Sequence, residues 1–381
     1  MPRILLITRN FPPLVGGMER LIQNLYKQLQ PAYTVDLVGP SGCSEYVSKS
    51  DKAVESPVRP LIAFLASSFI KAVWLAIKSR HEVIFSGSGL TAPAAVFAGR
   101  LSSTPAITYI HGLDLIVDNR IYQHLFVPMI RLADLVIVNS HNTAQLAISA
   151  GIPADRIEVI HPGVDSRDNN SSKTDFRSRF DLHNKEILLS VGRLIPRKGI
   201  AEFILHSLPN IVASHPDAVF VVIGAEPEDA LKKDASVLKQ IKENISQTGL
   251  EGHVVLAGKV DDPILQAAYS EAELCIFPLM EVAGDVEGFG MVAIEAAAHG
   301  LPTIAFSVGG VVDAIDDGKT GFLIEPDDYT AFTDACINYL SHNYPQVSAA
   351  SCKKFSASFH WDEFGKKINQ SIEKIAQHRI K

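Results

Sequence analysis

The stretch Glu287-Gly-Phe-Gly-Met-Val-Ala-Ile-Glu295 limits what this chain can be more than any other segment. Its two carboxylates stand eight residues apart, and the apolar run up to residue 298 predicts a helix packed on a sheet and ended by Gly300 and Pro302. Gly288 and Gly290 would let a ligand approach the start of this helix, where unpaired N–H groups favour an anion. One acid in the preceding loop and one about two turns later suit a nucleotide-sugar. An ordinary capped surface helix is the alternative.

The composition is that of a globular protein. The chain has 381 residues, of which 47% are hydrophobic and 20% charged, so about two to three domains are expected. A net charge of −7 argues against a dedicated nucleic-acid binder. Residues 1–165 carry a net charge of +2 and the remaining residues a net charge of −9, which suggests different partners for the two halves. The cysteines lack zinc-site spacing, and the chain begins with a strand rather than a signal peptide, so we expect a cytoplasmic protein with reduced thiols.

Residues 61–77 form the most apolar segment. It contains Lys71 and is flanked by Arg59, Lys78 and Arg80. The segment is short, and charged in its middle, for a membrane span. We predict a crossover helix packed on the sheet. The alternative is a helix in 61–80 whose exposed apolar and basic residues contact a membrane surface.

Short apolar strands alternate with helical patterns along the chain, as is typical of parallel, doubly wound sheets. The first half has strands at 4–8, 34–38, 82–86, 106–110, 135–139 and 157–160, with helices at 18–29 and 142–149. A polar linker follows at 165–174, and then strands at 186–191, 218–224, 254–257, 274–278, 303–306 and 321–324. We therefore predict an α/β fold with two Rossmann-like domains, 1–167 and 168–360, facing across a cleft, and a helix at 361–381 that packs back on the first domain.

Open α/β sheets bind ligands at the carboxyl ends of their strands, and a cationic loop falls at such a place. In Ser190-Val-Gly-Arg-Leu-Ile-Pro-Arg-Lys-Gly199 the side chains of Arg193, Arg197 and Lys198 follow a buried strand. A guanidinium and an ammonium there suit a diphosphate, since the first binds as a fork and the second as a point charge. A solvated basic loop is the alternative.

Polar motifs also follow strands of the first domain. Gly16-Gly17 stand at a helix start, His111-Gly-Leu-Asp114 follows one strand, and Asn139 ends another. His111 could equally be structural, and residues 161–165 suggest an ordered hinge turn. In the second domain, backbone amides of residues 307–310 are expected to line the same pocket as the glutamate helix. The chain has no P-loop, no Asp-x-Asp and no clustered metal ligands, so no metal is expected.

Taken in order, these motifs resemble the family-4 retaining glycosyltransferases of the GT-B fold over essentially the full length. The motifs are Gly16-Gly17, His111-Gly-x-Asp, Arg193 with Lys198, the glutamate pair, and Gly309-Gly310. The Asp285-Val-Glu-Gly-Phe-Gly segment is similar to bacterial mannosyltransferases that use GDP-mannose. Residues 225–227 and 311–313 depart from the family's usual sequence.

The resemblance implies roles for individual residues. Arg193 and Lys198 would hold the donor diphosphate and stabilise it as it leaves. Glu287 would bind the donor sugar with His111 beside it, and Glu295 would bind the ribose. The expected donor-binding set is Gly16, Gly17, Asn139, Gly258, Lys259, Val260, Gly288, Phe289, Gly290, Met291 and Glu295, with residues 258–260 next to the base.

The resemblance also implies the activity: retaining transfer of a hexose, mannose favoured, from a nucleoside-diphosphate sugar to a saccharide, without a metal or cofactor. A lipid-linked acceptor in polysaccharide or lipopolysaccharide synthesis, at the inner face of the plasma membrane, suits the basic first domain and residues 61–80. The alternatives are a UDP-hexose or UDP-N-acetylhexosamine transferase, a sugar-nucleotide epimerase, and a nucleotide-sugar-binding protein without turnover.

Overall fold

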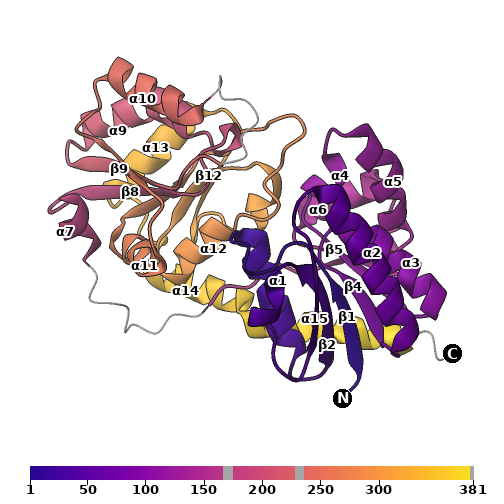
Figure 1. The fold of residues 1–381 in the computed structure, drawn as a ribbon. Coiled ribbons are helices and arrows are strands. Elements are labelled where there is room, and N and C mark those ends of the chain that lie inside the picture. Colours follow the sequence, from indigo (N-terminus) through magenta and orange to yellow (C-terminus); the bar gives the residue numbers. More distant parts are fainter. Residues whose placement is uncertain (166–174, 228–235, 378–381) are drawn as a thin grey trace. The chain divides into compact units, whose positions relative to one another are not determined.

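The computed structural model describes residues 1–165, 175–227 and 236–377, and its internal contacts divide the chain into two units (Figure 1). The first unit comprises Met1–Gly163 and Trp361–Lys381, and the second Val164–His360. The predicted linker lies outside the described residues except for Asp165.

The first unit contains a seven-stranded parallel sheet in the order β3-β2-β1-β4-β5-β6-β7. The strands are β1 Arg3–Ile7, β2 Thr34–Pro40, β3 Lys52–Ser56, β4 Val83–Ser86, β5 Ala106–Ile110, β6 Leu135–Val138 and β7 Ile157–Val159. The six predicted strands are confirmed, and β3 was not predicted.

Helices cover both faces of this sheet. They are α1 Gly17–Leu29, α2 Leu61–Lys78, α3 Ala92–Ser102, α4 Leu113–Ile116, α5 Arg120–Arg131, α6 His141–Ser149 and α15 Trp361–Gln377. In Figure 1, α15 lies beside β1 and β2 although it is last in the chain. Its buried residues Trp361, Phe364 and Ile368 share one core with α1 and the strands. The first core is therefore completed by residues more than 300 positions away in the sequence.

The second unit repeats the architecture with six parallel strands in the order β10-β9-β8-β11-β12-β13. The strands are β8 Glu186–Val191, β9 Ala218–Ile223, β10 Val254–Gly258, β11 Leu274–Phe277, β12 Thr303–Phe306 and β13 Gly321–Ile324. Its helices are α7 Phe176–Phe180, α8 Ile200–His206, α9 Leu208–Ser214, α10 Val237–Thr248, α11 Asp262–Glu271, α12 Met291–Ala298, α13 Tyr329–Leu340 and α14 Ala349–Ser356. All six predicted strands are confirmed, as is the helix after Gly290, here α12.

The strand orders place a ligand crevice in each unit. The order reverses direction between β1 and β4 in the first sheet and between β8 and β11 in the second. At such a switch point the connections leave in opposite directions, and ligands of open α/β sheets bind there beyond the carboxyl ends of the strands. The loops after β8 and β11 are those of the cationic motif and of the glutamate motif.

Helix α2 is the one helix of the described residues that is long and apolar enough to cross a membrane by length and composition, and 28% of it is buried. Ala72, Leu75 and Ala76 pack in the same core as strand residues Leu5 and Ile7. The predicted crossover helix is therefore confirmed. Its outward face is apolar, with Ile70 67% and Ile77 64% exposed.

We expect Ile368→Ala to lower the free energy of unfolding of the first unit by about 2–5 kcal/mol, because a fully buried side chain would leave a cavity between α15 and the sheet. Urea denaturation followed by circular dichroism measures this. Lys366→Ala on the exposed face of the same helix is the control and should change stability by less than about 0.5 kcal/mol. Equal effects of both substitutions would contradict the packing of α15.

Candidate functional site

Two loops meet at the switch point of the second sheet. The loop after β8 ends in a short 3-10 helix, Pro196–Lys198, and the loop after β11 occupies residues 278–290. The Met280 N–H donates to the Arg197 carbonyl at 2.9 Å. Gly199 has φ +63°, and a Cβ atom there would lie 1.8 Å from the Pro278 carbonyl oxygen. Only glycine therefore allows the two loops to approach this closely.

The contact between the loops is a buried cluster of charges. The Lys198 ammonium lies 2.7 Å from Oε2 of Glu287, and the Arg197 guanidinium donates to the same oxygen. Arg197 Nε also lies 3.1 Å from Oδ2 of Asp285. The side chains of Arg197, Lys198 and Glu287 are 7%, 11% and 14% exposed. Lys198 Nζ further stands 4.4 Å from the ring centroid of Phe277, so both cations are held on several sides.

The cluster changes the acidity of its members. Burial opposes ionisation of Glu287, but the charges of Lys198 and Arg197 outweigh burial and lower its pKa to about 2. Burial, with the nearby charges of Arg197 and Arg193, lowers the pKa of Lys198 despite the opposing charge of Glu287. The carboxylates of Glu287 and Asp285 raise the pKa of Arg197 against the effect of burial. Glu287 therefore stays a carboxylate at neutral pH.

Arg193 has a different environment. It is exposed, and no acidic residue in the described parts of the chain forms an ion pair with it. It lines a small hollow together with Gly192 and Lys198 at the end of β8. Arg193 is thus the cation of this loop that is most accessible to an anionic ligand.

The backbone around Glu287 is fixed from the opposite side. The Gly310 N–H donates to the Glu287 carbonyl at 2.8 Å, and a Cβ atom on Gly309 would approach that oxygen to 2.7 Å. Gly290 has φ +91° and precedes α12, whose first residue is Met291. Phe289 is 2% exposed and packs near Phe359, so its side chain belongs to the core and only its backbone is available to a ligand.

The second glutamate is also held. Glu295 lies on α12 and accepts a hydrogen bond from the Tyr269 hydroxyl of α11 at 3.0 Å. Tyr269 is 2% exposed, so the carboxylate is oriented by a rigid neighbour. Strand β10, at the edge of the sheet, ends at Gly258, and Lys259 directly after it is exposed. The predicted base-contacting loop therefore stands two strands away from β8.

In the first unit, His111 follows β5 and is 9% exposed. Its Nε2 lies 3.0 Å from the Gly87 carbonyl, and its backbone N–H donates to Asp114 at 2.8 Å. Because a carbonyl only accepts, Nε2 is the donor in this contact. Gly17 begins α1, and a Cβ atom there would meet no other atom within 4 Å, whereas one on Gly16 would approach Glu19.

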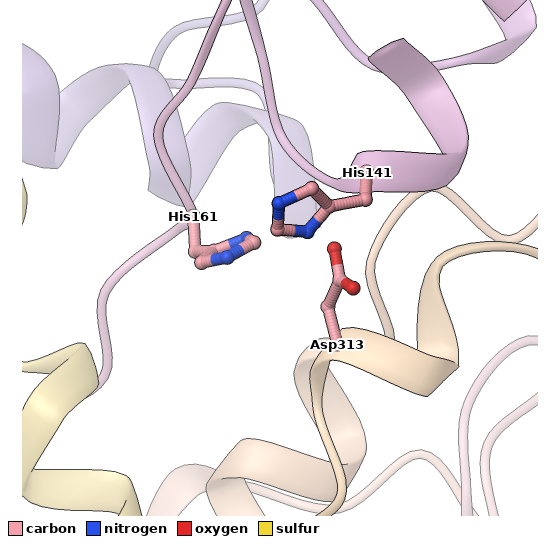
Figure 2. Close-up of side chains that lie close together, drawn as sticks. All are labelled: His141, His161 and Asp313. Atoms are coloured by element: carbon pink, nitrogen blue, oxygen red, sulfur yellow. The ribbon is translucent and has the colours of Figure 1, made fainter. Parts of the chain in front are cut away.

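Asn139 lies at the carboxyl end of β6 and is 5% exposed. Its side-chain oxygen is buried and accepts no hydrogen bond from the described residues, while its carbonyl lies 3.0 Å from Nδ1 of His161. The rings of His161 and His141 have centroids 5.6 Å apart and planes tilted by 56° (Figure 2). Asp313, which the figure also labels, belongs to the second unit.

The sequence did not indicate three of these contacts. The predictions placed Arg197 in the cationic loop but gave it no partner, and they gave no role to Asp285 or Tyr269. The signal for Arg197 and Asp285 was only that both stand within two residues of Lys198 or Glu287. Nothing in the sequence pointed to Tyr269.

Two family models match the chain: "Glycosyl transferases group 1" over residues 185–342 and "Glycosyltransferase Family 4" over residues 15–168. A GDP-mannose-dependent alpha-(1-6)-phosphatidylinositol monomannoside mannosyltransferase of Mycolicibacterium smegmatis is 26% identical over 366 residues, covering 91% of each chain. Anabaena Alr3699/HepE in complex with UDP has a TM-score of 0.78 at 20% identity, covering 98% of this chain and 100% of the other. The lipopolysaccharide outer core galactosyltransferase WaaB has a TM-score of 0.71 at 18% identity, covering 98% and 99%.

The chain therefore belongs to the family-4, group 1 glycosyltransferases, a family of retaining hexosyltransferases, and it has the GT-B fold. The predicted family, the two doubly wound parallel sheets and the enzyme class are confirmed. Membership in this family is compatible with a GDP-sugar and with a UDP-sugar as donor. The roles of the individual site residues remain predictions.

We expect Gly199→Ala to destabilise the second unit and to weaken nucleoside-diphosphate binding, because the added Cβ atom would push the cationic loop away from Pro278. Gly249→Ala is the matched control. Gly249 has a similar φ of +68°, but a Cβ atom there would meet no other atom within 4 Å, so this substitution should cost only about 1–2 kcal/mol. Urea unfolding and calorimetric binding measure both. Equal costs for the two variants would contradict the close contact of the loops.

Proposed function

We propose that this glycosyltransferase transfers mannose from GDP-mannose to a saccharide acceptor, with retention at the anomeric carbon. The observation that carries the class of donor, a nucleoside-diphosphate sugar, is the buried Lys198–Glu287 pair shortly before α12, with Arg193 exposed beside it. A cation pair suits the donor diphosphate, and a carboxylate that stays ionised suits the hydroxyls of the sugar.

The chemistry requires the sugar–phosphate bond to break and the diphosphate to leave with its charge stabilised. Arg193 and Lys198 would supply this stabilisation, and the N–H groups at Gly290 and Met291 would add to it. Glu295, oriented by Tyr269, would accept hydrogen bonds from the ribose hydroxyls. Substitution of either cation would cost about 10²-fold in turnover. No metal is needed in this scheme.

The GDP-mannose assignment is supported by relatives rather than by geometry. The Mycolicibacterium smegmatis relative is a GDP-mannose-dependent mannosyltransferase at 26% identity. A UDP-hexose donor is the second candidate, since Alr3699/HepE was solved with UDP and with UDP-glucose. Family membership favours a transferase over a binding protein or an epimerase.

The acceptor that we propose is a lipid-linked saccharide, used in cell-surface polysaccharide or lipopolysaccharide synthesis. The first unit would bind it, at the cytoplasmic face of the membrane. The support comes from one surface, the apolar face of α2 and α3. It consists of the exposed residues Ile62, Ile70, Trp74, Ile77, Phe97 and Leu101.

This face has the chemistry of a membrane contact. Phe69 and Phe97 join the two helices, with ring centroids 5.1 Å apart. Lys52 and Lys78 each place Nζ 4.6 Å from the centroid of the Trp74 ring. Exposed isoleucines next to cations favour an interface of acyl chains and anionic headgroups over bulk water.

We expect GDP to raise the melting temperature more than UDP or ADP, and EDTA to leave the shift unchanged. Saturation at about 100 times the Kd would stabilise the native state by about 2.7 kcal/mol. Arg193→Ala should abolish the shift, and Arg179→Ala, an exposed arginine on α7, should retain it. Thermal-shift titration measures all of these. A larger shift with UDP would move the donor to a UDP-sugar, and no shift with any nucleotide would overturn the proposed function.

We expect the double variant Ile70→Ser/Ile77→Ser to bind vesicles of phosphatidylglycerol and phosphatidylcholine at least about tenfold more weakly, because two exposed apolar side chains are lost. Lys78→Gln should weaken binding only to anionic vesicles, by about 1 kcal/mol at low salt. Val312→Ser, at an exposed apolar residue of the second unit, is the control. Unchanged cosedimentation of the double variant would leave a soluble acceptor as the better proposal.

A further inference from the structure

The loop that carries Glu287 contains a turn that fixes the position of Asp285. The Asp285 N–H donates to the Val282 carbonyl at 3.0 Å, and Gly284 within this turn has φ +76°. The turn directs the Asp285 carboxylate to Arg197 of the other loop, 3.1 Å from its Nε. The Met280 N–H to the Arg197 carbonyl is a second link between the same loops. Arg197 is therefore fixed through both its backbone and its side chain.

The two cations of the cluster share one carboxylate oxygen. Arg197 and Lys198 both donate to Oε2 of Glu287, and no described residue donates to Oε1. Two donors on one oxygen hold the carboxylate in one orientation and leave Oε1 as the acceptor for a ligand hydroxyl.

The charges of this cluster balance. Arg197 and Lys198 face Asp285 and Glu287, so the four side chains carry no net charge. Without Arg197, Glu287 would have Lys198 as its only partner in the cluster, and its carboxylate would be held by one donor instead of two.

We propose that Arg197, held by Asp285, is a positioning residue that orients Glu287 for the donor sugar, and that it is not a ligand of the diphosphate. The inference rests on the proposed function of the site. It separates the three cations of the loop by role: Arg193 and Lys198 contact the donor, and Arg197 acts through Glu287.

The variant that tests this is Arg197→Met, which keeps an unbranched apolar stem and removes the guanidinium group with its charge. The affinity for GDP should change by less than about threefold. By contrast, kcat should fall by about tenfold to a hundredfold, and so should the factor by which GDP-mannose binds more tightly than GDP. This is the loss expected when a reacting group is displaced by about 1 Å. Arg193→Met should instead weaken GDP itself by about tenfold or more. Isothermal titration with GDP and GDP-mannose, and kcat and KM for GDP release, measure both.

Further variants keep the test independent of folding. Asp285→Asn retains Arg197 and should give a smaller effect of the same pattern, and Arg197→Lys should restore part of kcat. Arg179→Met is the surface control. If Arg197→Met loses GDP affinity as severely as Arg193→Met, Arg197 is a direct ligand and the proposal is overturned.

A ligand-free measurement separates this proposal from the proposed function. Because Arg197 helps to lower the pKa of Glu287, Arg197→Met should move the midpoint of acid unfolding to higher pH. The same shift is expected whichever nucleotide the protein binds, or if it binds none. A midpoint equal to that of the unsubstituted protein would show that Arg197 does not hold Glu287, and it would overturn the proposal even if GDP-mannose is the donor.

Discussion

The site of the second unit depends on one constraint: two loops that carry opposite charges must meet in a place from which water is largely excluded. A buried charge is costly unless it is paired and hydrogen-bonded. Lys198, Arg197, Asp285 and Glu287 meet this condition together, because each has at least one opposite charge within 3.1 Å. The reversal of strand order between β8 and β11 brings the loops to one crevice, and the missing side chain at Gly199 lets them touch. Removing one of these charged side chains would leave its partner's charge uncompensated, so the cluster forms as a unit.

The fold could be predicted because its central strands are buried on both faces. Strands β1, β4, β5, β6, β8, β9, β11 and β12 are near-continuous apolar runs, and parallel sheets covered by helices produce this pattern. Strand β3, Lys52-Ala-Val-Glu-Ser56, was not predicted because it pairs only with β2 at the edge of its sheet and most of it is only partly buried. An edge strand has one neighbour and needs no apolar run. The boundaries of β5, β8, β12 and β13 match the prediction, and those of the other predicted strands differ from it by one or two residues.

The candidate site was predictable in its loops and not in its contacts. The cationic and glutamate motifs each follow a strand, so the rule for open sheets placed both at one edge. What the sequence could not show is which cation meets which carboxylate, since Arg197 and Glu287 are 90 residues apart. The turn that ends at Asp285 decides this pairing, and its geometry depends on Gly284 and on the backbone link to Met280. In the same way, Tyr269 reaches Glu295 from a different helix, so no local pattern could reveal it.

The two switch points are alike in topology and unlike in chemistry. The crevice of the second unit is lined by paired and exposed charges, as an ionic donor requires. The corresponding edge of the first unit has two buried side-chain oxygens, the hydroxyl of Ser88 and the amide oxygen of Asn139, that make no hydrogen bond with the described residues. Buried polar atoms without partners are costly, and a ligand rich in hydroxyls would satisfy them. A saccharide is such a ligand, so the edge of the first unit suits a sugar for the same physical reason that the charged loops suit a diphosphate.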